Sequence, residues 1–196
     1  ITKELNITGK FSFLHFYDRR ARRLLPVLLV IFFVSFPFAW YLLLPESFVD
    51  YAKSIIASNI FLSNFYWYDS LQVYGTEASN LKPFLHTWSL AVEEQYYFIF
   101  PIILIAIVRW FKLNVIGILT LLILLSLQFA EMMSKSDPSF SFYMLISRFW
   151  ELLLGSLLAY TLYIHPAKEN DTLLTKTMPS IGIYFILYSI VFIDYN

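Results

Sequence analysis

The sequence contains no cysteine among its 196 residues. Disulfide bonds, thiolate nucleophiles and cysteine-ligated metal sites are therefore excluded for this chain. Charged residues are scarce as well, at 14% of the sequence, whereas soluble domains carry about 25%. The 14 basic and 14 acidic residues give a net charge of zero. Because the chain has no overall positive charge, we expect no nucleic-acid partner.

Hydrophobic residues take the place of the missing charges. They form 59% of the chain, aromatic residues form 20%, and the mean hydropathy is +0.64. A helix of about 20 apolar residues crosses a bilayer core of about 30 Å. The sequence therefore predicts an all-α polytopic transmembrane helix bundle with about five spans. The predicted spans are 24–44, 84–110, 113–130, 140–164 and 178–193, and Pro26 and Pro37 are expected to kink the first.

The segment 46–82 is predicted to lie at the membrane surface or to re-enter the membrane without crossing it. Its part 51–68 is aromatic but carries several polar residues, and 69–82 is a polar loop. Lys and Arg accumulate in the cytoplasmic loops of membrane proteins. With five spans, one side receives Arg19, Arg20, Arg22, Arg23, Arg109, Lys112, Lys168 and Lys176, and the other only Lys53, Lys82 and Lys135. This bias would collapse if 51–68 also crossed, so we expect 1–23 to be a cytoplasmic basic segment and 46–82 to be an outer helix and loop.

The stretch from Lys82 to Pro101 joins a polar half to an apolar half. Ionisable side chains at membrane depth are costly and indicate a functional site. Helical spacing places His86 and Glu93 on one face, with Ser89 between them. A histidine and a carboxylate on one face suit general acid–base catalysis, a proton relay or the binding of a hydroxylated ligand. Alternatively, Glu93 or Glu94 pairs with a buried arginine. No second histidine lies nearby, so no metal site is predicted.

Two further groups of charged residues are candidates. Arg19, Arg20, Arg22 and Arg23 abut the first apolar run. Guanidinium groups at this spacing suit phosphate and pyrophosphate, although plain membrane anchoring by positive charge explains them as well.

The other group is a pair within the fourth predicted span. Arg148 and Glu151 are three residues apart, so they are neighbours on one helix face. They form either a self-contained ion pair with a packing role, or a site in which Arg148 neutralises Glu93 or Glu94 or holds an oxyanion.

Five stretches in this order resemble one known family. They are FYDRRARRLLP (16–26), LPESFVDY (44–51), SNFYWY (63–68), LKPFLHTWSLAVEEQYYFIFP (81–101) and RFWELLLGSLLA (148–159). The resemblance is to the integral-membrane acyltransferase-3 family, specifically to bacterial O-antigen and surface-polysaccharide O-acetylases. It covers about residues 11–194.

The resemblance implies a multi-pass enzyme of the bacterial inner membrane. It would move acetyl from cytoplasmic acetyl-CoA, as co-substrate and without a metal, to hydroxyls of a cell-surface polysaccharide such as lipopolysaccharide, or of a lipid-linked glycan. Expected partners are membrane lipids, the glycan acceptor and an SGNH-type domain C-terminal to this sequence. The implied donor-binding residues are Arg19, Arg20, Arg22 and Arg23; the catalytic residues are His86, Glu93 and Glu94; and the supporting residues are Ser89, Arg148 and Glu151.

One departure from the family pattern stands out. The family carries an arginine and, eleven residues later, a catalytic histidine in its first span, and this sequence has no such pair. We therefore expect an internal fragment, incomplete at both ends and inactive alone.

The predicted topology also sets Lys82–Glu94 on the outer side, opposite the arginines, which argues against one site made of both. The competing interpretations are a transporter or flippase with a Glu93, Glu94 and Arg148 network, or a non-catalytic scaffold.

Overall fold

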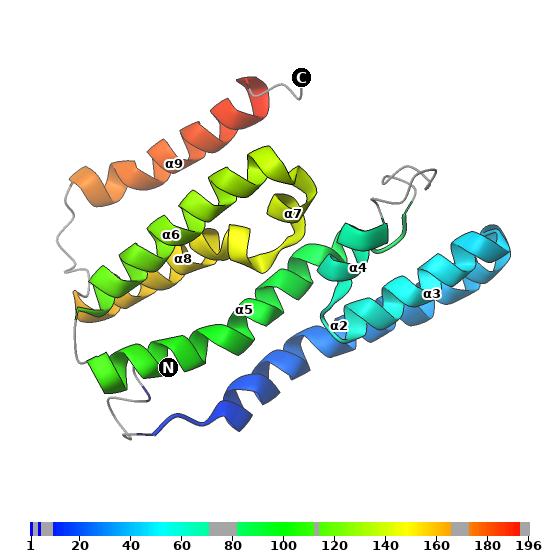
Figure 1. Ribbon diagram of the computed structural model, residues 1–196, viewed down its shortest axis with the longest axis horizontal. Helices are drawn as coiled ribbons and strands as arrows, with labels where there is room; N and C mark the ends of the chain where they lie inside the picture. Colours follow the sequence, from blue (N-terminus) through cyan, green and yellow to red (C-terminus); the bar gives the residue numbers. More distant parts are fainter. Residues whose placement is uncertain (2–3, 5–9, 71–81, 112–113, 166–172, 193–196) are drawn as a thin grey trace. The chain divides into compact units, whose positions relative to one another are not determined.

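The computed structural model describes residues 1, 4, 10–70, 82–111, 114–165 and 173–192. Every secondary-structure element among these residues is helical (Figure 1). The chain divides into two compact units, Ile1–Tyr160 and Thr161–Asn196. Among the described residues, four helical stretches are long and apolar enough to cross a membrane: Phe13–Leu42, Thr87–Arg109, Val115–Ser136 and Pro138–Ile164. The predicted all-α transmembrane class is confirmed.

Helix α2 (Phe13–Leu42) contains the arginine-rich segment. It begins at Ser12, whose side chain accepts a hydrogen bond from the backbone N–H of His15, and it continues through both prolines. The basic segment and the predicted span 24–44 thus belong largely to one continuous helix, and the position along it at which the membrane begins stays a prediction. Arginine is a good helix former, and its long apolar stem can lie along apolar surface while the charge reaches a partner, so nothing ends the helix at the arginines.

Two shorter helices follow, α3 (Pro45–Asn59) and α4 (Ser63–Ser70). α3 folds back along α2, as Figure 1 shows, and the hydroxyls of Ser35 and Tyr51 lie 2.9 Å apart across the two helices. The backbone then reverses at Phe61, whose φ is 55°. The predicted outer helix is thus two helices joined by a tight turn, and neither is long enough to be a span. Residues 71–81 of the predicted loop lie outside the described residues.

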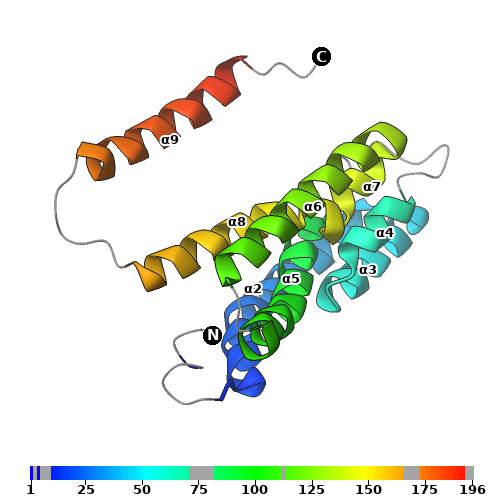
Figure 2. The same ribbon diagram turned by 60° about the vertical axis from the view of Figure 1, so that its left-hand side comes forward.

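The rest of the first unit is built on α5 (Thr87–Ala106), which ends in a π-helical turn, η2 (Ile107–Phe111). α6 (Val115–Ser136), α7 (Pro138–Tyr143) and α8 (Leu145–Ile164) follow. Figures 1 and 2 both show α6 and α8 side by side. Tyr96, Leu119 and Leu153 are 2% exposed or less and form the centre of the core between these helices. The predicted span 140–164 is broken at Met144 into α7 and α8.

The second unit contains the end of α8 and helix α9 (Leu173–Phe192). The apolar stretch within α9 among the described residues is Pro179–Ser189, which is shorter than the four candidate spans. The predicted fifth span, 178–193, corresponds to this helix except for its last residue, which lies outside the described residues. Whether α9 crosses a membrane stays a prediction.

Candidate functional site

A cleft of about 370 Å³ lies between α2, the turn that joins α3 to α4, and α5. We call it the Arg20 cleft. Leu24, Leu25, Phe98 and the turn residues 60–62 give it apolar walls. Its polar lining consists of Tyr17, Arg20, Glu94 and Gln95.

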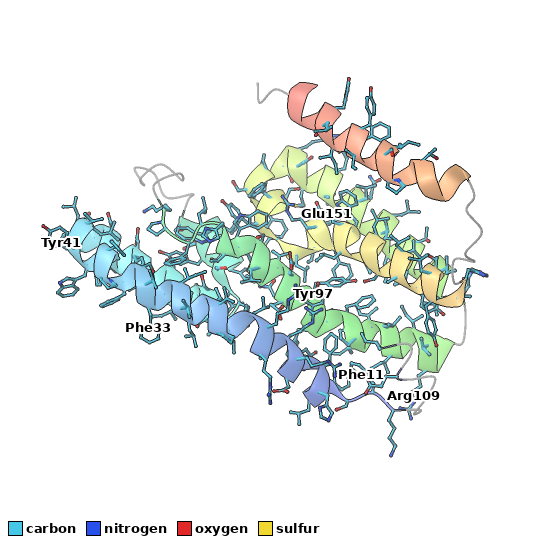
Figure 3. The ribbon with its side chains drawn as sticks, turned by 180° about the vertical axis from the view of Figure 1, so that it is seen from behind. Phe11, Phe33, Tyr41, Tyr97, Arg109 and Glu151 are labelled. Carbon is cyan, nitrogen blue, oxygen red and sulfur yellow. The ribbon has the colours of Figure 1, made fainter. Side chains whose placement is uncertain are left out.

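An ion pair joins the two helices inside this cleft. Arg20 Nη1 lies 3.6 Å from Glu94 Oε1, and the two side chains are 27% and 13% exposed. The Arg20 guanidinium also lies 3.0 Å from the ring centroid of Tyr97, a cation–π contact that is strongest where water is excluded. Figure 3 shows the position of Tyr97 on α5. A charged pair on helices long enough to span a membrane is costly, which favours a functional role.

Tyr17 fixes the register between α2 and α5. Its hydroxyl donates a hydrogen bond to the backbone carbonyl of Phe98 over 3.1 Å. Its ring stacks on that of Phe98 at a centroid distance of 5.2 Å. Because Phe98 lies near the middle of α5, these contacts place Arg20, one helical turn further along α2, beside Glu94.

Gln95, the neighbour of Glu94, holds the turn between α3 and α4. Its side-chain N–H₂ donates to the carbonyl of Phe61 and to Asn64 Oδ1, both over 2.8 Å. About two helical turns before Glu94 and Gln95, buried polar side chains also fasten the start of α5. The hydroxyls of Thr87 and Ser58 lie 2.7 Å apart, and Ser63 donates to the Thr87 carbonyl. The cleft is therefore closed on this side by a polar seam that sequence reasoning did not assign.

The remaining residues of the signature stretch lie elsewhere. His86, Ser89 and Glu93 are all exposed, and the Ser89 hydroxyl donates to the His86 carbonyl. Within the described part of the chain, no hydrogen bond or ion pair joins the side chains of His86 and Glu93. The shared face exists, but it does not line the Arg20 cleft. The catalytic roles of His86 and Glu93 stay predictions.

The structure corrects the predicted separation of the arginines from the signature stretch. Arg20 contacts Glu94 directly, so α2 and α5 contribute to one site. The prediction was wrong because it counted all four arginines as loop residues that face water. Arg20 instead finds a carboxylate and two aromatic rings, those of Tyr97 and Phe16. Arg19, Arg22 and Arg23 are exposed, and Arg22 pairs with Asp18 over 3.0 Å.

Arg148 does not neutralise Glu93 or Glu94. Its Nη1 lies 3.4 Å from Glu151 on the same helix, and its Nε donates to the Phe142 carbonyl over 2.7 Å. Its guanidinium lies 4.8 Å from the ring centroids of Trp88 and Phe142. Among the described residues Arg148 is thus paired with Glu151 and not with Glu93 or Glu94, and the alternative that it holds an oxyanion stays a prediction. Figure 3 shows Glu151 on α8, away from the start of α2.

Sequence comparison identifies several relatives of this chain. The chain is 35% identical over 181 residues to an uncharacterized protein of Haemophilus influenzae, a match that covers 88% of this chain and 71% of that protein. It is 33% identical over 156 residues to O-acetyltransferase OatA of Staphylococcus aureus, covering 78% of this chain and 26% of OatA. A putative O-acetyltransferase of the same species is 31% identical over 202 residues, covering 100% of this chain and 33% of that protein.

The chain belongs to the same family as the Haemophilus protein. The names of the staphylococcal relatives indicate that this is a family of acyltransferases. The chain spans about a quarter to a third of the length of those named relatives, whose coverage is 26% and 33%. No protein-family profile matches the chain, and no solved structure matches it significantly.

Proposed function

We propose that this chain is part of a membrane O-acetyltransferase that moves acetyl from acetyl-CoA on the cytoplasmic side to a hydroxyl of a cell-surface glycan. The Arg20–Glu94 pair carries the proposal. It joins the arginine-rich start of α2 to the signature stretch of α5 within an apolar cleft. The names of the staphylococcal relatives support the same chemistry.

The exposed arginines would bind the donor. Arg19, Arg22 and Arg23 are open at the start of α2, and guanidinium forks bind phosphate oxygens in pairs. The phosphates of acetyl-CoA are their natural partners. The Arg20 cleft opens beside them, and its apolar walls suit the acyl end of the thioester. The donor would therefore lie along the first turns of α2 with its acetyl group in the cleft.

The transfer step replaces the C–S bond of the thioester by a C–O bond and moves one proton from oxygen to sulfur. The acceptor hydroxyl oxygen attacks the thioester carbonyl carbon, a C–O bond forms and the C–S bond breaks. The hydroxyl proton passes through a base to the sulfur, which leaves as the CoA thiol. Arg20 can stabilise the negative charge that develops on the carbonyl oxygen, because a fixed donor in a site without water acts strongly. Glu94 would hold Arg20 in position, and the resemblance implies that a histidine serves as the base.

The test uses the whole protein in membranes with radiolabelled acetyl-CoA. We expect label in the glycan fraction, and Glu94→Gln should reduce its rate of appearance at least tenfold because Arg20 loses its partner. Glu46→Gln, at an exposed position of α3, is the matched control and should keep full activity. Changing Arg19 and Arg22 together to Gln should raise the KM for acetyl-CoA. Absence of label in the glycan, or full activity of Glu94→Gln, would refute the proposal.

The same assay separates the transporter interpretation from this one. A transporter or flippase needs no acetyl-CoA and leaves the glycan unlabelled. A scaffold protein likewise transfers no label. Glycan labelling that depends on the protein therefore decides between the three classes.

A further inference from the structure

The charges that line the Arg20 cleft cancel. Among the described residues in its walls, Arg20 is the only cation and Glu94 the only anion. The two other polar side chains, those of Tyr17 and Gln95, are a phenol and an amide, which carry no charge at neutral pH. The cleft therefore has no net charge, and its one positive group stands beside a carboxylate.

The guanidinium of Arg20 has hydrogen-bond donors to offer a ligand. Its distance of 3.6 Å from the Glu94 carboxylate is longer than that of a charge-assisted hydrogen bond, which is about 2.7–2.9 Å. Its contacts with the rings of Phe16 and Tyr97 are cation–π contacts, which use no N–H acceptor. Because a guanidinium carries five N–H donors, Arg20 can donate to the carbonyl oxygen of a bound acyl group while Glu94 stays beside it.

A carboxylate at the far end of the acyl group would upset this balance. One guanidinium would then stand beside two carboxylates, and each like charge disfavours the other. If the new carboxylate displaced Glu94, a side chain that is only 13% exposed would lose its partner, which is strongly destabilising for a buried charge. An apolar acyl end of the same length would instead contact the walls formed by Leu24, Leu25 and Phe98 without this penalty.

We propose that the Arg20 cleft selects uncharged acyl groups and that Glu94 determines this specificity. Thioesters of short saturated acids, such as acetyl and butyryl, fit the cleft. Thioesters of dicarboxylic acids, such as succinyl, do not. The inference rests on the proposed function for the placement of the acyl group in the cleft, and it adds the class of acyl group and the residue that selects it.

The test measures equilibrium binding of acyl-CoA thioesters to the whole purified protein in nanodiscs, without an acceptor. Succinyl-CoA and butyryl-CoA are the matched probes, because their acyl chains have the same length and end in a carboxylate and a methyl group. We expect butyryl-CoA to bind no more weakly than acetyl-CoA, since its longer chain meets apolar walls. Succinyl-CoA should bind about tenfold more weakly than butyryl-CoA or worse, because its carboxylate competes with Glu94.

A variant connects the difference to Glu94. In Glu94→Gln, Arg20 has no carboxylate beside it and can pair with that of succinyl, so the gap between the two probes should narrow. Glu93→Gln is the matched control, because Glu93 is exposed and does not line the cleft, and it should leave the gap unchanged. Melting temperatures check that both variants fold, and the wild-type comparison of the two probes depends on neither.

Four results would overturn the proposal. They are equal binding of succinyl-CoA and butyryl-CoA by the wild-type protein, a gap that Glu94→Gln leaves unchanged, rejection of both probes, which would show selection by size, and failure to bind any thioester. The proposed function has a separate readout in the transfer of label to glycan. If uncharged thioesters bind selectively but no label is transferred, the selectivity of the cleft stands and the acetyltransferase assignment fails. If label is transferred but the two probes bind alike, only the selectivity fails.

Discussion

Arg20 differs from the three neighbouring arginines in what surrounds its guanidinium. Arg19, Arg22 and Arg23 are exposed, but Arg20 lies between Glu94 and the rings of Phe16 and Tyr97. Helical spacing put Arg19 on one face with Arg22 or Arg23, and the resemblance implied that all four arginines bind the donor. The sequence could not show that Arg20 contacts Glu94, because helical spacing says which residues share a face but not which face meets a neighbouring helix.

The same limit applies to the two adjacent glutamates. Glu93 is exposed, whereas Glu94 lines the cleft. Neighbouring positions on a helix point about 100° apart, so one of them had to face away from any single partner. The alternative that a glutamate pairs with an arginine was correct, although the partner comes from α2 and not from α8. The sequence analysis did not predict that Tyr17 and Tyr97 belong to the site. Tyr17 lies three residues before Arg20, and Tyr97 lies three residues after Glu94. This helical spacing could have indicated both.

Asp137 provides a test of local stability. Its carboxylate accepts hydrogen bonds from the Phe140 backbone N–H over 2.9 Å and from the Tyr68 hydroxyl over 2.7 Å. Both bonds hold the pKa of Asp137 below its usual value, and the bond from Phe140 contributes more. A lowered pKa in the folded state stabilises the protein above the unfolded-state pKa, and this stability is lost as the pH falls through the folded-state value.

We therefore expect Asp137→Asn to lose part of the acid sensitivity of the wild-type protein. The measurement is the melting temperature of both proteins in acidic and neutral buffers, with Glu46→Gln as control. The difference between wild type and Asp137→Asn should be largest at neutral pH and shrink in acid. A difference that stays constant with pH would show that the carboxylate bonds do not form.

At the scale of elements, the turn between α3 and α4 was the least predictable part of the fold. The sequence indicated a segment that does not cross, because crossing would have reversed the later charge bias. It did not indicate where the segment turns, since Phe61 is neither glycine nor asparagine and yet has a φ of 55°. The turn is set by tertiary contacts, chiefly those from Gln95 to Phe61 and Asn64.

Replacing Gln95 by leucine should therefore loosen the turn. The change leaves the Phe61 carbonyl and the Asn64 side chain without their donor, a loss of about 1–3 kcal/mol for a buried polar group. The free energy of unfolding in detergent, measured by denaturant titration, is the readout. Gln128→Leu, at an exposed position of α6, is the control and should cost far less. Equal stability of the two variants would remove Gln95 from the account of the turn.

The long helices themselves were predicted closely, because runs of apolar residues are the strongest signal that a membrane chain carries. The predicted span 84–110 corresponds to the candidate span Thr87–Arg109. The basic segment and the first predicted span form one helix, because the Ser12 cap begins that helix before the arginines. The predicted span 140–164 corresponds to the candidate span Pro138–Ile164, but its break at Met144 was not predicted, because no proline or glycine marks it.

At the scale of the whole molecule, α5 is the helix against which the start of α2 forms the candidate site. The Arg20 cleft lies between these two helices and the turn that joins α3 to α4. We infer that the arginine-rich start of α2 and the signature stretch of α5 act as one site.

A double-mutant cycle tests that claim most directly. Arg20→Gln, Glu94→Gln and the double variant are compared with the wild-type whole protein by the initial rate of acetyl transfer to glycan. Residues that act through one interaction are not additive and show a coupling energy of about 0.5–3 kcal/mol. We predict that the double variant is no slower than the slower single variant. If the two losses instead multiply, Arg20 and Glu94 act independently and the single site is contradicted.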